Sequence, residues 1–323
     1  MLSSFTIAFL VYDSRSGSTI LAKTLNDRFQ GLHVTPEFDL SGMLEGRHVR
    51  GMRLQPQLDD RSVANLSVDG DRLHAIVADG RLDGAERLRR TLSLYRATRH
   101  DPASPEGNID TILVKSGTHL RHVAALRATL GDDTRFVFLH RDPRDVIASK
   151  LHTRRPYVPD EVMAWGGALL AALRWTQYAR AAERAQHCGA SVHAVSYADF
   201  VNDPDAVCRE VARFLGAALR CEKSRVPNTT GYTVPQAEQA IHAGSVDGRV
   251  DAARARYNRE SLSRRQDIVI DAVCGPAMQR LGYARRTPVG RLSELMALLV
   301  SAAESALLIG RHARRRLPVI GHR

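Results

Sequence analysis

Small and basic residues that could bind an anion follow the first apolar run of the chain. That run, Thr6–Tyr12, is predicted to be a buried strand, and DSRSGST follows it before apolar residues recur at helical spacing. Backbone N–H groups at the start of such a helix can converge on a phosphate-like group, and Gly17 would permit close approach. Further donors would come from Arg15, Ser18 and Thr19. The alternative is a serine-rich N-cap on an ordinary helix.

This loop differs from the phosphate-binding loop of nucleoside triphosphatases, G-x-x-x-x-G-K-[ST], at two positions. Tyr12 stands where that motif has its first glycine, and Ser18 stands where it has its lysine. Because the lysine contacts the β- and γ-phosphates, its replacement disfavours ordinary magnesium-nucleotide hydrolysis. The loop therefore predicts anion binding of another kind.

A second candidate anion site lies where a later strand meets its helix. Asp142 can cap that helix, and Pro143 suits its first position. Arg141 comes at the strand end, beside the helix N-terminus, and Ser149 lies two turns into the helix. Together Arg141 and Ser149 could hold a second phosphate, at the other end of a ligand whose first end meets the Gly17 loop.

The elements that must position these residues alternate between strand and helix patterns. Strands are predicted at Thr6–Tyr12, Thr111–Val114, Arg135–Leu139 and Ser191–Val195, each followed by apolar residues at helical spacing. This alternation predicts an α/β fold with a mostly parallel sheet between two layers of helices. Ser41–Gly80 and Arg225–Gly248 fit this pattern poorly and are expected to include loops, and ligands bind where loops leave the carboxyl ends of parallel strands.

Composition narrows the classes of partner. The chain has 323 residues and a formal charge of +11, and 42 of its 46 cationic side chains are arginine (46 minus four lysines). Without interleaved aromatic residues or a basic repeat, this excess does not predict nucleic-acid binding. Four cysteines without C-x-x-C spacing argue against zinc and a disulfide framework. We expect no secretory signal and a cytoplasmic protein, since no uncharged apolar run reaches the roughly 18 residues of a membrane span.

The ordered set of motifs resembles the sulfotransferases that use 3′-phosphoadenosine 5′-phosphosulfate (PAPS). SRSGST follows the first strand, VKSGTHL begins at Val114, and RFVFLHRDPRDVIAS begins at Arg135. Val195–Gly216 and Val269–Tyr283 match as well. The resemblance spans roughly residues 5–284 and is closest in pattern to the bacterial, carbohydrate and tyrosylprotein branches. It implies a three-layer, P-loop-like domain over residues 1–284, followed by a tail over residues 285–323.

The resemblance also implies roles for individual residues, with PAPS as co-substrate and no metal. The loop around the 5′-phosphosulfate would consist of Arg15, Ser16, Gly17, Ser18 and Thr19. Arg141 and Ser149 would bind the 3′-phosphate. Arg15 would stabilise charge on the bridging oxygen, and Lys115 would face the sulfuryl group. Adenine contacts are expected around His242–Arg256.

Two residues compete for the role of catalytic base. Glu37, 20 residues after Gly17, resembles the glutamate of the carbohydrate and tyrosylprotein branches. Its structural alternative is an acid in the first turn of a helix capped by Thr35. His119 resembles the catalytic histidine of the cytosolic branch, although it lies two residues further from Lys115. Its alternative is a surface or capping residue.

These motifs predict in-line transfer of a sulfuryl group to a hydroxyl acceptor, which could be a carbohydrate, a lipid-linked molecule or a small molecule. Two other functions stay open. One is a P-loop-like small-molecule kinase, which would need Mg²⁺ and the missing lysine. The other is a nucleotide-binding protein without catalysis, in which Glu37 and His119 are structural.

The tail is predicted to form an amphipathic helix. Within Arg291–Arg311 the polar residues fall in about a third of the helix circumference, at roughly 100° per residue; they are Ser293, Glu294, Ser301, Glu304 and Ser305. The other residues are apolar, and RHARRR follows. Such a helix could make peripheral contact with an anionic membrane. The alternative is packing on the body of the protein or on a second subunit of a homodimer.

Overall fold

A computed structural model describes residues 5–29, 31–40, 48–49, 52–53, 58, 60–98, 110–155, 158–216, 259–285 and 290–316. The chain folds into two compact units. The first comprises Met1–His140 with Ala181–Val250, and the second comprises Arg141–Arg180 with Asp251–Arg323.

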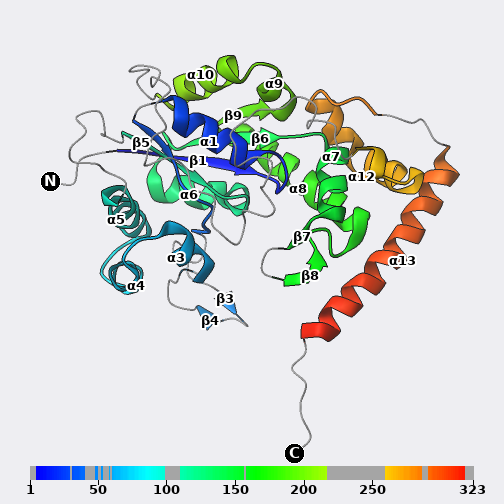
Figure 1. Ribbon diagram of the computed structural model, residues 1–323, viewed down its shortest axis with the longest axis horizontal. Helices are drawn as coiled ribbons and strands as arrows, with labels where there is room; N and C mark the ends of the chain where they lie inside the picture. The colour runs from blue at the N-terminus through cyan, green and yellow to red at the C-terminus, as the bar shows by residue number, and fades with distance from the viewer. Residues whose placement is uncertain are drawn as a thin grey trace, which may run out of the picture. The chain divides into compact units, whose positions relative to one another are not determined.

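A parallel five-stranded sheet forms the centre of the first unit, in the order β2-β5-β1-β6-β9. Its strands are β1 (Thr6–Tyr12), β2 (Leu32–Val34), β5 (Thr111–Lys115), β6 (Arg135–His140) and β9 (Ser191–Ser196). The central strand β1 is apolar over its buried length because both faces of the sheet are covered. In Figure 1, α1 (Ser18–Arg28) and α10 (Pro204–Leu215) lie on one face of the sheet, and α6 (Val123–Leu130) lies on the other.

Short elements complete the first unit. They are the strands β3 (His48–Val49) and β4 (Met52–Arg53), and the helices α3 (Asp60–Leu66), α4 (Gly70–Ala78), α5 (Gly84–Ala97), η1 (Thr118–His122) and α9 (Tyr197–Asn202). The turn η1 is a 3-10 helix directly after β5. Asp69 and Asp83 cap α4 and α5, each accepting a hydrogen bond from a backbone N–H of the first turn.

The second unit is mainly helical. It contains α7 (Pro143–His152), most of α8 (Gly167–His187), α12 (Arg264–Arg280) and α13 (Arg291–Arg316), with the hairpin β7 (Arg154–Arg155) and β8 (Val158–Val162) and the 3-10 turn η3 (Arg259–Ser261). Its core joins α7, α8 and α12 through apolar side chains that include Ile147, Trp175 and Met278. By length and composition, the segment Arg291–Ala313 of α13 is apolar enough to cross a membrane.

The predicted α/β architecture is confirmed, and each of the four predicted strands corresponds to an observed one. Strand β2 was not predicted because three residues carry too little periodicity. The poorly patterned stretch Ser41–Gly80 contributes α3 and α4. Arg225–Gly248 and His242–Arg256 lie outside the described residues.

Candidate active site

The loop between β1 and α1 has the backbone of an anion-binding turn. Arg15 and Gly17 both have positive φ, at 72° and 95°. Gly17 is the N-cap of α1, and no side chain caps this helix. The serine-rich cap considered as an alternative is therefore not formed. The hydroxyl of Ser16 is buried and has no hydrogen-bond partner among the described residues. Such a polar group needs a partner, and an anion at the start of α1 would supply one.

A tyrosine from the start of α9 covers this loop. Tyr197 begins α9 directly after β9, and a Cβ atom added to Gly17 would lie 2.2 Å from Cε2 of its ring. Ser196 positions the tyrosine by capping α9 through a bond from Asp199 N. Gly17 is thus required twice, by its left-handed backbone and by the ring against it.

Gly17→Ala is expected to lower the free energy of unfolding by about 2–4 kcal/mol, because backbone strain and overpacking add. The measurement is urea-induced unfolding. Gly189→Ala is the matched control, since Gly189 has φ of 75° but nothing within 4 Å of an added Cβ. Its loss should stay near 1 kcal/mol, from strain alone. Equal losses in the two variants would show that the Tyr197 ring yields to the new methyl group.

A carboxylate, a phenol and an ammonium group meet at the carboxyl edge of the sheet. Tyr12 ends β1, and its hydroxyl donates to Glu37 Oε2 at 2.9 Å. Lys115 ends the neighbouring strand β5, and its Nζ lies 3.8 Å from the same oxygen and 5.4 Å from the centre of the Tyr12 ring. The lysine side chain is 1% exposed, whereas that of Glu37 is 31% exposed. A buried cation therefore faces a carboxylate that solvent or a substrate can reach.

The segment carrying Glu37 is not the start of a helix, contrary to the structural alternative considered for this residue. It continues from β2 alongside the end of β5. Thr35 Oγ1 accepts from Lys115 N at 3.0 Å, and Phe38 N donates to Lys115 O at 3.3 Å. Asn65 of α3 donates to the carbonyl of Glu37 at 2.7 Å. These bonds hold Glu37 beside Lys115 without using its carboxylate.

His119, the other candidate base, is enclosed in the fold. It is 1% exposed, its Nε2 accepts from Leu40 N at 3.1 Å, and its ring meets Phe9 edge-on. Burial lowers its pKa to about 4. Burial likewise lowers the pKa of His140, at the end of β6, to about 4. Both rings are therefore neutral near pH 7 and add no positive charge at this edge.

The predicted second anion site lies at the start of α7. Asp142 caps the helix by accepting from Arg144 N at 3.0 Å, and Pro143 occupies its first turn, as predicted. The Asp142 carboxylate also takes two bonds from the Arg144 guanidinium, at 2.9 and 2.6 Å. Trp175 Nε1 donates to the carbonyl of Arg141 at 3.1 Å. The backbone that carries Arg141 is thus rigidly held, and Ser149 is buried further along α7.

The predicted site residues divide between the two units. Arg15–Thr19, Glu37, Lys115 and His119 belong to the first, whereas Arg141 and Ser149 belong to the second. Neither Tyr12 nor Tyr197 was predicted to be a site residue. The one sequence feature that could have pointed to them is their position, since each lies where a strand of the parallel sheet meets the segment that follows it. In the described part of the chain, no group of three His, Cys, Asp or Glu residues is placed to hold a metal.

Sulfotransferase domains are among the solved structures that match this chain. The sulfotransferase domain from the curacin biosynthetic pathway matches 88% of this chain and 100% of its own length, with a TM-score of 0.52 and 16% identity. The sulfotransferase domain from the Synechococcus PCC 7002 olefin synthase covers 93% of this chain and 95% of its own, with a TM-score of 0.44 and 19% identity. No curated protein sequence matches. The sequence profile of the sulfotransferase family, however, matches residues 9–220, and the chain therefore belongs to that family.

Proposed function

We propose that this protein transfers a sulfuryl group from PAPS to the hydroxyl of an acceptor. The observation that carries the proposal is the meeting of Glu37, Tyr12 and Lys115 at one edge of the sheet. The loop between β1 and α1 begins at the same edge, and α1 has no side-chain cap. A base, a cation and an anion-binding turn at one place are the groups that sulfuryl transfer requires. Family membership supports the transferase class.

The α1 loop fits the phosphosulfate end of the donor. Uncapped N–H groups of the first turn, the buried Ser16 hydroxyl and the Arg15 guanidinium would hold its anionic oxygens. Ser18 and Thr19, both buried in the first turn of α1, would add hydroxyl donors. Bound PAPS would supply an activated sulfuryl group on a phosphate leaving group. Arg15 would then stabilise the charge that develops on the bridging oxygen.

Glu37 is the proposed base. Its Oε2 is oriented by the Tyr12 hydroxyl, and its exposed fraction leaves room for an acceptor hydroxyl to approach. His119 is the weaker candidate, because the lone pair of Nε2 already accepts the bond from Leu40 N. Lys115 contacts the same oxygen of Glu37 and would stabilise negative charge on the transferring group.

Arg141 and Ser149 are the proposed ligands of the 3′-phosphate. Strands β1 and β6 are parallel neighbours, with Tyr12 paired to Leu139, so the two strands end at the same edge of the sheet. Arg141 follows β6 directly and precedes the Asp142 cap of α7, so the proposed contacts to the 3′-phosphate are those of the Arg141 and Ser149 side chains. A 3′-phosphate is the group that separates this donor from ATP.

The experiment is calorimetric binding of 3′-phosphoadenosine 5′-phosphate and of AMP. Wild type should prefer the 3′-phosphorylated ligand, and Arg141→Ala should weaken its binding roughly 10–100-fold, the value of one or two charge-assisted bonds, with little effect on AMP. Arg174→Ala is the control, because Arg174 is also partly buried in the second unit but lies over the Trp165 ring. Equal affinity of wild type for the two ligands would refute the assignment.

The acceptor class is proposed from the position of the base. Glu37 is the feature shared with the carbohydrate and tyrosylprotein branches, so we favour the hydroxyl of a carbohydrate or a lipid-linked molecule. Transfer that persists in EDTA would exclude the magnesium-dependent kinase alternative.

A further inference from the structure

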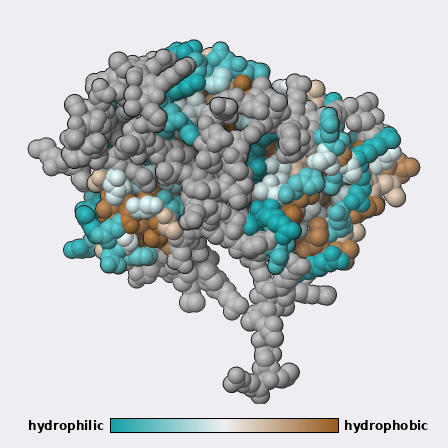
Figure 2. Space-filling model, in the orientation of Figure 1, coloured by the Kyte–Doolittle hydropathy of each residue, from teal (hydrophilic) through white to brown (hydrophobic). Residues whose placement is uncertain are grey.

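Helix α13 presents an apolar face to the outside. The large hydrophobic side chains that are exposed in the described residues all lie on α13, apart from Leu173 of α8; they are Leu292, Leu295, Met296, Leu299, Val300, Leu307 and Ile309. Leu292 is 73% exposed and Leu307 is 67% exposed. At about 100° per residue these side chains cover roughly half of the helix circumference. Figure 2 shows hydrophobic residues at the surface where α13 runs in Figure 1.

The polar stripe of α13 instead faces the other elements of the second unit, to which α13 itself belongs. Ser301 and Ser305 are buried, and the hydroxyl of Ser305 donates to Gly166 O at 2.8 Å. Glu304 accepts from Arg265 of α12 at 2.6 Å. His312 bonds Glu161 Oε1 at 2.6 Å and stacks on Trp165. The predicted helix therefore forms, but it is oriented opposite to an ordinary amphipathic surface helix, which buries its apolar side.

We propose that the outward face of α13, defined by the seven hydrophobic residues above, binds an anionic lipid membrane. Exposed apolar surface that is contiguous along a whole helix marks an interaction site in a folded protein. A bilayer interface accepts leucine, methionine and valine side chains to a depth of about 5–10 Å. This inference does not depend on the proposed sulfuryl transfer.

The charges of α13 favour lipid over a second copy of the chain. Arg291 opens the apolar stretch and Arg311 ends it, and the sequence continues with arginine at 314–316. Neither glutamate of the helix is on the outward face, since Glu304 pairs with Arg265 and Glu294 is partly buried. Pairing two such faces would bring positive ends near positive ends in either direction. Anionic phospholipid complements both ends, at about 1 kcal/mol per basic residue near the surface.

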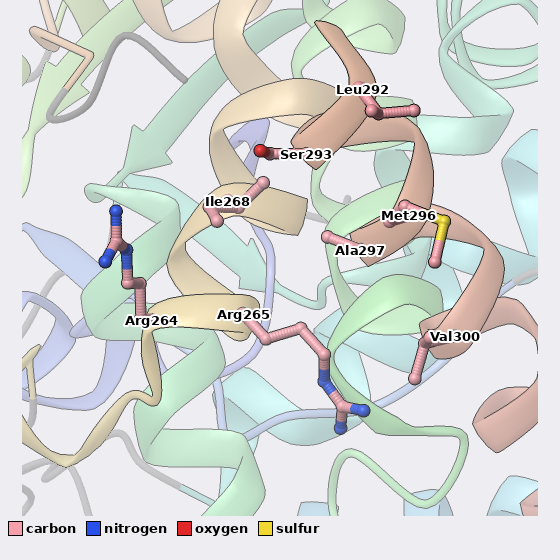
Figure 3. A pocket seen from close by; sticks show the side chains of 8 residues that line it. All are labelled: Arg264, Arg265, Ile268, Leu292, Ser293, Met296, Ala297 and Val300. Carbon is pink, nitrogen blue, oxygen red and sulfur yellow. The ribbon is translucent and has the colours of Figure 1, made fainter. Parts of the chain in front are cut away.

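A groove between α12 and α13 adds a place for lipid beside this face. It has a volume of about 520 Å³, and Figure 3 shows Met296 and Val300 of α13 on one side with Arg264 and Arg265 of α12 on the other. The apolar wall of this groove suits an acyl chain, while the guanidinium of Arg265 already pairs with Glu304 of α13. The groove thus extends the lipid-binding surface from α13 onto α12.

The contacts of Ser305, Glu304 and His312 with other elements of the second unit indicate that α13 lies along the membrane rather than across it. A spanning helix would have to give up the bonds of Ser305, Glu304 and His312 to the second unit. Two of those groups are ionisable, and moving ionisable side chains into the bilayer core is costly. With these bonds kept, only the outward half of the helix can enter lipid.

The test is co-sedimentation of the full-length protein with vesicles of phosphatidylcholine alone or mixed with phosphatidylglycerol. We expect binding to the mixed vesicles, weaker binding to phosphatidylcholine alone, and release at raised salt. The double variant Leu299→Gln, Leu307→Gln should reduce partitioning at least about tenfold, because each change removes a leucine from the lipid contact. Neither leucine lines the groove, so the packing of α12 stays intact.

Leu173→Gln is the matched control, since Leu173 is 44% exposed, like Val300, but lies on α8. It should bind vesicles as wild type does, and all three proteins should unfold at the same temperature. Absence of vesicle binding, or unchanged binding of the double variant, would overturn the proposal. A dimer in sedimentation equilibrium that the double variant dissociates, without vesicle binding, would assign the face to a second copy of the chain.

Discussion

Replacing Glu37 by Gln is expected to lower kcat by roughly 10²–10⁴-fold, the usual contribution of a positioned base. The amide keeps the size of the side chain and can still accept from the Tyr12 hydroxyl, so the local structure should persist. What it loses is the ability to take the proton of the acceptor hydroxyl. Binding of 3′-phosphoadenosine 5′-phosphate should be unchanged, which separates catalysis from donor binding.

The control for this variant is Glu210→Gln, which makes the same chemical change at an exposed position of α10. It should leave kcat and donor binding unaltered. A Glu37→Gln protein that keeps full turnover would transfer the role of base to His119. In that event His119→Gln should be inactive, and the bond from Leu40 N to the imidazole must open during the reaction.

Lys115→Met is expected to reduce kcat by about 10²–10³-fold, as loss of one preorganised charge in an active site does. Methionine fills nearly the same volume, so the apolar surroundings of the buried side chain are kept. Glu37 keeps its hydrogen bond from the Tyr12 hydroxyl and its access to solvent, so its carboxylate is not left buried without a partner. The fold should therefore survive the substitution. Steady-state kinetics at saturating donor measure the loss.

Lys23→Met serves as its control, because Lys23 lies on α1 of the same unit and is only partly buried. Donor affinity of Lys115→Met should fall less than kcat does, since the proposed contact is with the reacting group. If affinity fell and kcat did not, Lys115 would be a donor-binding residue without a part in charge stabilisation. Both variants should first be compared in thermal unfolding.

Local patterns in the sequence were sufficient for the framework of the fold. Strands β1, β5 and β6 are short apolar runs, and such runs indicate buried parallel strands. The Asp142-Pro143 cap of α7 also followed from residue types alone, because capping involves only neighbouring backbone groups. Strand β2 was missed, since it is held by pairing with β5 rather than by its own pattern.

Local sequence patterns do not distinguish the two candidate bases. Glu37 and His119 were both reasonable bases by spacing, and only tertiary contacts distinguish them. One carboxylate is partly open beside Lys115, whereas the imidazole is sealed against Phe9 and Leu40. Tyr197 lies against Gly17 although the two residues are far apart in the sequence, and no motif links the two positions.

The order of strands and helices and the amphipathic character of α13 followed from the sequence alone, whereas the anion-binding residues remain a prediction. The tertiary structure decided which groups meet and which way each face points. Helical periodicity shows that polar residues share one side of a helix, but it carries no direction. Only the burial of Ser301 and the hydrogen bond from Ser305 to Gly166 turn that side inward, and four leucines are then left outside: Leu292, Leu295, Leu299 and Leu307.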